Sequence, residues 1–288
     1  MIRTPLATSL PSSGSRRALL RGLLLGALLP SGAWAQPPPA PFVPPKPAAA
    51  RTENAAIPAA IPLPLSYDLQ LTDAPATGRI ILAGGCYWGM QAVFQHVKGV
   101  SNVIAGYTGG LKSTANYAKV TGDPSTGHAE AVLIEYDTSK LTLGTLLQIY
   151  FFVAHDPTQL NRQGPDVGPQ YRSSIFTDVT EEKRVAVTYM NDIDAAKLLP
   201  HPIATKLRDT FPFYKAEGYH QNYVQNHPTQ RYVLYNDQPK IARLKSLFPQ
   251  LYRDTPLRYV PDDRRTPKLP PKPGSGSEAG TGSASAAS

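Results

Sequence analysis

Residues 79–89 have the sequence RIILAGGCYWG, in which a short apolar run leads through two glycines to a cysteine. The apolar run, 79–83, has the length and composition of a buried β-strand. Apolar side chains then recur at helical spacing over residues 90–97. The pattern therefore predicts that Cys86 lies at a turn between a strand and a helix.

Cys86 is the one cysteine among 288 residues, and its position favours a chemical role. Unpaired N–H groups at a helix N-terminus favour the thiolate, which is the reactive form of cysteine. The flanking glycines permit tight backbone angles and close approach of a substrate. Tyr87 and Trp88 could form a wall of an apolar pocket beside the thiol. The alternative is that Cys86 is a small buried hydrophobic residue and that the two aromatic side chains are core.

The periodicity of the following residues indicates the fold class. Strands are predicted at 79–83, 100–107, 129–136 and 172–177, and helices after Cys86 and after Thr142. The order βαββαβ is typical of a ferredoxin-like α+β two-layer sandwich. Additional helices and long loops are expected, with one further helix from Thr180 to about Leu199.

Glu130 is the carboxylate of most interest in these strands. Strand alternation places it on the same face as Val132, Ile134 and Tyr136. Burial there would raise its pKa from about 4.3 toward 6 or 7, where a glutamic acid donates protons near neutral pH. The alternative is a glutamate at the strand end that points into water.

Several motifs together resemble the A-type peptide methionine sulfoxide reductases. The segment GCYWG at 85–89 is similar to the active-site signature of that family, with Tyr87 where phenylalanine is usual. Further matching motifs follow in the family's order: YTGG at 107–110, NY at 116–117, TGHAE at 126–130, HDP at 155–157 and NRQGPDVGPQYRS at 161–173. The resemblance extends from about Arg79 to about Tyr252 and implies a ferredoxin-like core.

The resemblance also implies an activity, the thiol-dependent reduction of the S epimer of methionine sulfoxide in proteins and as the free amino acid. Cys86 would attack the sulfoxide sulfur and become a sulfenic acid, while Glu130 protonates the oxygen. Tyr87 and Trp88 would hold the S-methyl group. No cofactor is implied.

Four more residues match the family's pocket. Tyr117, Asp166 and Tyr171 correspond to groups that bind the sulfoxide oxygen and order the pocket, and His220 lies in a further matching segment, 218–223. Tyrosine hydroxyls and a buried aspartate suit these roles chemically. As isolated residues they would be packing tyrosines and a turn aspartate, since Asp166 lies among glycines and prolines.

Two other kinds of site have little support in the sequence. The six histidines show no paired spacing of a metal-ligand set, so no metal is predicted. A cysteine–histidine hydrolase would also use Cys86, but no thiol-protease signature surrounds it.

The two ends of the chain differ in composition from its centre. Residues 1–35 contain an arginine pair, a short apolar stretch and a small-residue cleavage pattern, which predict a twin-arginine-like export signal. Residues 36–75 are rich in proline and alanine and predict an extended spacer. The reductase-like domain is predicted at 76–253, followed by a disordered tail, basic and then Gly/Ser-rich, at 254–288.

The formal net charge of +8 belongs mostly to these flanks. Residues 76–252 contain 17 basic and 14 acidic side chains, a net charge of +3. No basic run is interleaved with aromatic residues there, so nucleic-acid binding is not predicted.

The predicted partners are methionine sulfoxide in oxidised proteins and an external reductant. Many members of the family carry additional cysteines near the C-terminus, whereas this chain has none, so a thioredoxin-like protein or a small-molecule thiol must reset Cys86. A monomer in the bacterial periplasm is expected, with no stable membrane span. A different hypothesis is a non-catalytic envelope protein that binds partners through its proline-rich arm and basic tail.

Overall fold

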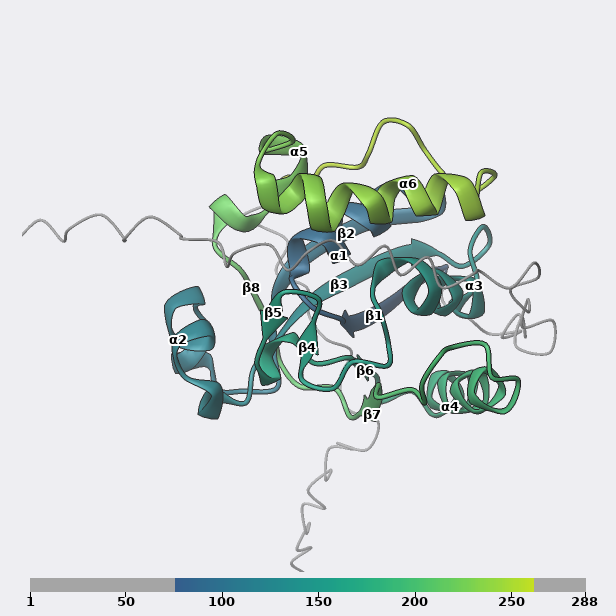
Figure 1. Cartoon of the computed structure of the whole chain (residues 1–288), viewed down its shortest axis with the longest axis horizontal. Coiled ribbons are helices and arrows are strands. Elements are labelled where there is room, and N and C mark those ends of the chain that lie inside the picture. The colour runs from purple at the N-terminus through teal and green to yellow at the C-terminus, as the bar shows by residue number, and fades with distance from the viewer. Residues whose placement is uncertain (1–75, 262–288) are drawn as a thin grey trace, which may run out of the picture. The chain divides into compact units, whose positions relative to one another are not determined.

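The computed structural model describes residues 76–261, and its centre is a six-stranded sheet (Figure 1). The strands are, in chain order, β1 (Thr77–Ala83), β2 (Val100–Thr108), β3 (Ala129–Asp137), β6 (Ser174–Phe176), β7 (Lys206–Arg208) and β8 (Phe213–Lys215). A separate two-stranded ribbon consists of β4 (Arg162–Gln163) and β5 (Asp166–Val167).

The sheet confirms the predicted topology. Its strand order is β7-β6-β1-β3-β2-β8, and the four central strands β6-β1-β3-β2 pair with one another in antiparallel fashion. This is the arrangement of a ferredoxin-like βαββαβ unit, in which the fourth strand lies beside the first. The short strands β7 and β8 extend the two edges, β7 parallel to β6 and β8 antiparallel to β2.

Six α-helices are described in residues 76–261. They are α1 (Tyr87–Gln95), α2 (Tyr117–Gly122), α3 (Leu143–Ile149), α4 (Thr180–Ala195), α5 (Tyr223–Asn226) and α6 (Gln238–Leu247). Helix α3 begins after Thr142, as predicted, and Thr142 caps it, because its hydroxyl accepts a hydrogen bond from the Thr145 N–H at 3.2 Å. The helix then widens into a π-helical turn at Tyr150–Ala154.

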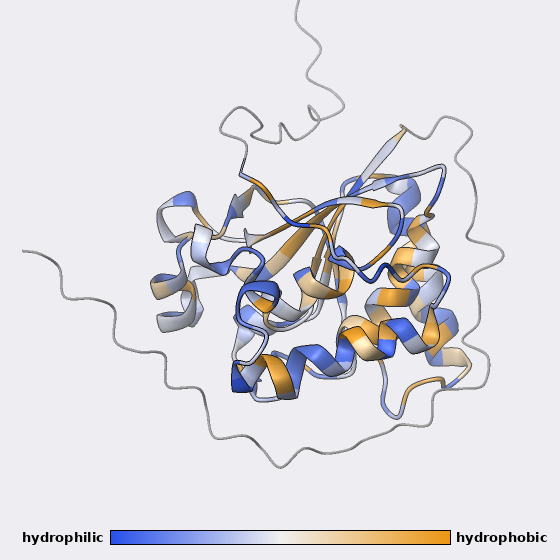
Figure 2. Ribbon diagram, turned by 90° about the horizontal axis from the view of Figure 1, so that it is seen from above, coloured by the Kyte–Doolittle hydropathy of each residue, from blue (hydrophilic) through white to orange (hydrophobic). Residues whose placement is uncertain are grey.

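The core divides between the two faces of the sheet. Alternate side chains of β1 and β3, such as Leu82 and Ile134, join a large apolar cluster with α1 and α3. The intervening side chains, such as Ile81 and Leu133, form a smaller cluster on the opposite face. Figure 2 shows the hydrophobic strands at the centre, with helices that are hydrophobic on some turns and hydrophilic on others. Even-numbered residues of β3 therefore face the helices, and odd-numbered residues face the opposite side of the sheet.

Two predicted elements are shorter in the structure. The helix expected to reach about Leu199 ends at Ala195, and Lys197 then has a φ of +52°, which a continuing helix does not allow. The strand expected at 172–177 covers 174–176. The strands β7 and β8 and the helices α2 and α5, all of six residues or fewer, were not predicted from the sequence, and neither was the ten-residue helix α6.

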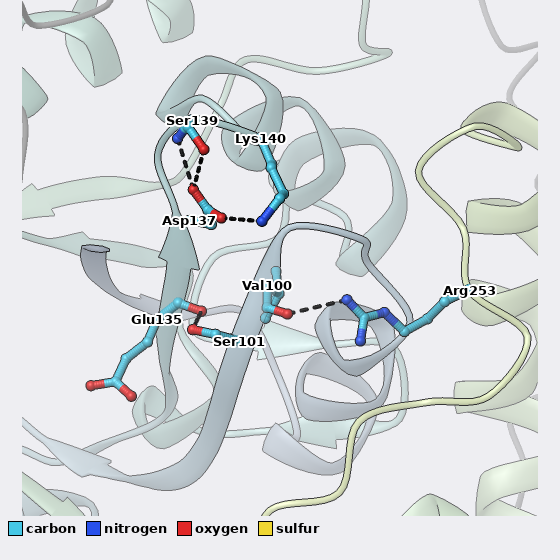
Figure 3. Close-up of polar contacts among 7 residues, drawn as sticks. All are labelled: Val100, Ser101, Glu135, Asp137, Ser139, Lys140 and Arg253. Carbon is cyan, nitrogen blue, oxygen red and sulfur yellow. Dashed lines mark hydrogen bonds and ion pairs between the residues drawn. The ribbon is translucent and has the colours of Figure 1, made fainter. Parts of the chain in front are cut away.

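Residues after α6 return to the start of β2 (Figure 3). The Arg253 guanidinium donates to the Val100 carbonyl at 3.2 Å, and Leu257 N–H donates to the Gln95 carbonyl at 2.9 Å. In the same region Asp137 accepts hydrogen bonds from the Ser139 N–H and from Lys140, which closes the turn after β3. Ordered contacts thus continue past residue 253, where the sequence analysis places the end of the domain.

The predicted signal at 1–35, the spacer at 36–75 and residues 262–288 of the predicted tail lie outside the described residues. Within residues 76–261, no helix combines the length and the apolar character needed to cross a membrane.

Candidate active site

Cys86 lies at the predicted turn, directly between β1 and the first residue of α1. The turn requires glycine at position 85, where φ is +90° and a Cβ atom would lie 2.5 Å from the Gln163 side chain. Cys86 is 8% exposed. The backbone therefore presents the thiol at the edge of the core, where it is close to solvent and mostly shielded from it.

The ionisation of Cys86 differs from the sequence-based expectation. Burial raises the pKa of the Cys86 thiol well above its ordinary value, and the nearby carboxyl groups of Glu130, Asp166 and Asp237 raise it further. The N–H of Trp88 in the first helical turn lowers it, but by less. The expectation that the helix N-terminus favours the thiolate is wrong for the unliganded protein, because desolvation outweighs that hydrogen bond.

Glu130 lies in the same buried region. It is 1% exposed, on the helix-facing side of β3, so the alternative of a glutamate pointing into water is wrong. Its carboxyl group accepts a hydrogen bond from the N–H of Tyr87 at 3.1 Å, which places it beside the turn that holds Cys86. Burial raises the pKa of Glu130 to about 8, although the Tyr87 N–H lowers it. Glu130 is therefore mostly protonated at neutral pH.

Trp88 is held on three sides by aromatic residues. Its ring stacks on Tyr223 with centroids 3.6 Å apart, and the edge-to-face contact with Tyr232 has centroids 5.7 Å apart. Its indole N–H donates to Nδ1 of His220 at 3.1 Å. The indole is thus fixed in orientation beside Cys86.

The contact with Trp88 also determines the proton position on His220. An indole N–H can only donate, so Nδ1 of His220 must accept and the ring proton lies on Nε2. Burial lowers the pKa of His220 to about 4, so the ring is neutral at physiological pH. His220 is 2% exposed, and its ring centroid is 4.6 Å from that of Tyr117.

The other predicted site residues lie within electrostatic range of Cys86 and Glu130. Burial raises the pKa values of Tyr117 and Tyr171, and negative charge on Glu130 and Cys86 would raise both further. Burial also raises the pKa of Asp166, which accepts a hydrogen bond from the Tyr232 hydroxyl. The structure thus brings these three residues to the region of the thiol. Tyr87 is fully buried, and its hydroxyl lies 3.1 Å from that of Tyr107.

Residues of this region that were not predicted as site residues include Tyr223, Tyr232 and Asp237. Asp237 is fully buried next to Gly89, and neither carboxyl oxygen has a hydrogen-bond partner within residues 76–261. Burial raises its pKa to about 7, while Lys240, with Nζ 4.0 Å from Oδ1, lowers it. The segment 232–239 contains no cysteine, and no local pattern in it marks Tyr232 or Asp237 as a site residue.

The arrangement suits nucleophilic chemistry with acid assistance. A thiol and a protonated carboxyl group lie beside one turn, enclosed by aromatic side chains that form an apolar boundary. Among residues 76–261, no three His, Cys, Asp or Glu side chains gather as metal ligands would.

The chain is similar to proteins of one known family. A family model described as peptide methionine sulfoxide reductase matches residues 78–251. A Mesorhizobium japonicum protein named peptide methionine sulfoxide reductase MsrA 2 is 55% identical over 184 residues, covering 64% of this chain and 94% of that protein. A Synechocystis protein of the same name is 46% identical over 177 residues, covering 62% of this chain and 82% of its own.

A solved structure is also similar. The reduced form of Mxr1 from Saccharomyces cerevisiae has 30% sequence identity and a TM-score of 0.48, and the match covers 54% of this chain and 88% of that one.

Proposed function

Because the chain belongs to the peptide methionine sulfoxide reductase family, A type, we propose that Cys86 reduces the S epimer of methionine sulfoxide in oxidised proteins. Methionine sulfoxide reduction and protein repair are the activities of this family, and the relatives support both. The observation that carries the assignment of residues is the pairing of Cys86 with a buried, protonated Glu130 at one turn. The interaction-protein alternative has no support from the comparisons.

In the proposed reduction of the sulfoxide, Cys86 and Glu130 exchange protons with the substrate without a net gain or loss. The sulfur of Cys86 attacks the sulfoxide sulfur, and Glu130 donates its proton to the sulfoxide oxygen. The hydroxyl group then transfers from the methionine sulfur to the Cys86 sulfur, so that the methionine S–O bond and the newly formed S–S bond both break. Methionine leaves, the thiol proton goes to the Glu130 carboxylate, and Cys86 is left as a sulfenic acid. The cysteine sulfur is oxidised by two electrons and the methionine sulfur is reduced by two.

The remaining residues bind the substrate. Trp88, fixed by His220 and Tyr223, is suited to hold the S-methyl group together with Tyr87. Tyr117 and Tyr171 keep their protons because burial raises their pKa values, so their hydroxyls are available as hydrogen-bond donors to the sulfoxide oxygen. Asp166, held by the Tyr232 hydroxyl, orders this side of the pocket.

The reset of Cys86 requires thiols from outside the chain. The sequence has one cysteine, and the segment 232–239 supplies aromatic and carboxyl side chains instead of a second thiol. A sulfenic acid and two external thiols give back the Cys86 thiol, one disulfide and water. The reductant would be a thioredoxin-like protein or a small-molecule thiol. We propose that the enzyme meets it as a monomer exported to the bacterial periplasm.

Turnover of the two sulfoxide epimers tests the function. The purified chain should reduce an S-sulfoxide methionine peptide with a dithiol reductant and leave the R epimer unchanged. A folded protein that reduces neither epimer would overturn the proposal.

A further inference from the structure

Glu217 joins three tyrosines around the proposed site through its carboxylate. Oε1 accepts a hydrogen bond from the N–H of Tyr117 at 2.9 Å, and Oε2 accepts one from the Tyr107 hydroxyl at 2.9 Å. The Tyr107 hydroxyl lies 3.1 Å from the hydroxyl of Tyr87. The carboxylate therefore links the first residue of α2 to the residue that follows Cys86.

The direction of these hydrogen bonds is fixed by proton count. A carboxylate can only accept, so the single Tyr107 proton points to Glu217. Tyr87 must then donate its own proton to the Tyr107 oxygen. Tyr87 and Tyr107 have exposed fractions of 0%, so water cannot replace either contact without a rearrangement of the core.

Tyr87 is tied at both ends to groups of the site. Its main-chain N–H donates to Glu130 at 3.1 Å, while its hydroxyl is committed to Tyr107. A shift of the Tyr87 ring would therefore move the N–H that contacts Glu130 as well as the ring beside the thiol. A buried hydroxyl without an acceptor would favour such a shift, because an unsatisfied buried polar group is costly.

We propose that Tyr107 and Glu217 are positioning residues, which hold Tyr87 and Tyr117 in place around the thiol. This role rests on the proposed sulfoxide reduction. The chain Tyr87–Tyr107–Glu217 gives the hydroxyl of residue 87 a buried acceptor on the side away from Cys86. Glu217 at the same time fixes where α2 begins, and with it the placement of Tyr117.

A double-variant comparison tests the Tyr87–Tyr107 contact. Tyr107→Phe removes the hydroxyl oxygen that accepts the Tyr87 proton and leaves the buried Tyr87 hydroxyl without a hydrogen-bond partner. The value of kcat/KM for the S-sulfoxide peptide should therefore fall about tenfold. When the same change is made in a Tyr87→Phe protein, no Tyr87 hydroxyl is left without an acceptor, and the further loss of kcat/KM should be under about threefold. Equal losses in the two backgrounds would overturn the proposal.

A matched pair of variants tests Glu217. Glu217→Gln keeps an oxygen for the Tyr117 N–H and offers an amide N–H to the Tyr107 oxygen, but one proton of the Tyr87–Tyr107 pair then has no acceptor. Glu217→Leu removes both contacts at similar size. We expect Glu217→Leu to lower kcat/KM at least about tenfold and Glu217→Gln, which retains the contact with the Tyr117 N–H, to recover part of that loss. If the two variants lose activity equally, the carboxylate does not position the site through these hydrogen bonds.

Thermal unfolding of the four proteins in the double-variant comparison provides a readout that needs no substrate. The melting temperature should fall more for Tyr107→Phe in the wild-type background than in the Tyr87→Phe background. If the wild-type protein reduces neither epimer, the proposed function fails, while the melting temperatures still test the hydrogen bonds. If Tyr107→Phe does not fold, the comparison of Glu217→Gln with Glu217→Leu tests the proposal instead.

Discussion

At the scale of single residues, the site holds two acids that both retain their protons at neutral pH. Burial raises the pKa values of Cys86 and Glu130 in the unliganded protein, and the negative charge of either group opposes ionisation of the other. A free thiolate is thus not the resting form. The reaction instead needs the thiol proton to move as the sulfoxide oxygen is protonated, which is why Glu130 has to lie beside Cys86.

Replacement of the thiol should end the chemistry without loss of the fold. Cys86→Ser keeps the size of the side chain at a position that is 8% exposed, so the melting temperature should change little. Sulfoxide reduction should disappear, because an alcohol cannot accept the oxygen in this way. The measurement is methionine formation by chromatography. Residual activity above a few per cent would contradict the role of Cys86.

Replacement of the acid should slow the reaction and alter its pH dependence. Glu130→Gln should lower the single-turnover rate by about 10²- to 10⁴-fold, as is typical when a general acid is lost. With a pKa of about 8, Glu130 holds its proton below that pH and loses it above, so the wild-type rate should fall as the pH rises through about 8. The Gln variant should lack this decline. An unchanged rate, or the same decline in the variant, would remove Glu130 from the mechanism.

At the scale of elements, the first turn of α1 packs against the π-helical turn Val233–Asp237. Gly89 makes this contact possible, because a Cβ atom there would lie 2.3 Å from Oδ1 of Asp237 and 3.0 Å from Nζ of Lys240. Helix α1 holds Cys86 at its start, so the packing of this turn and the position of the thiol are linked.

Gly89→Ala should therefore destabilise the protein. Overpacking of a core contact costs about 1–3 kcal/mol, which denaturant unfolding measures as a lower midpoint. The matched control is Gly122→Ala in α2, where an added Cβ meets no atom within 4 Å and where alanine is the better helix former. The Gly122 variant should be as stable as the wild type or more so. If Gly89→Ala is as stable as the wild type, the π-helical turn Val233–Asp237 accommodates the added Cβ atom without loss of stability.

At the scale of the whole molecule, the single cysteine limits each chain to one oxidising event. With excess S-sulfoxide and no reductant, the protein should form one methionine per chain and stop. Cys86 should then carry a sulfenic acid that a dimedone-type nucleophile traps and mass spectrometry locates. Two methionines per chain, or an unmodified Cys86, would exclude a cycle that depends on external thiols.

The N-terminal residues should determine where the protein acts. The arginine pair and the pattern Ala-Trp-Ala at 33–35 predict a mature chain that begins near Gln36. N-terminal sequencing of the protein from the host's periplasmic fraction measures this start. Recovery of the full-length chain from the cytoplasm would show that the signal is not used.

The sequence by itself determined the order of the main elements and the region of the reaction. The alternation of β3 assigned Glu130 to the helix-facing side, and the helical spacing after Cys86 predicted a turn at the thiol, because both depend on local periodicity. The short edge strands were not predictable in this way, since three-residue segments carry almost no periodic signal and form only against an existing sheet.

Tertiary structure alone decided the charge of the site and the partners of its side chains. Local sequence placed Cys86 at a helix N-terminus and so favoured a thiolate, whereas the packed protein surrounds the thiol with core residues and three carboxyl groups. The contact of Trp88 with His220 joins residues 132 positions apart, and that of Tyr107 with Glu217 joins residues 110 apart. Desolvation and long-range hydrogen bonds depend on which segments meet in the folded chain, and periodicity along the sequence contains no information about those meetings.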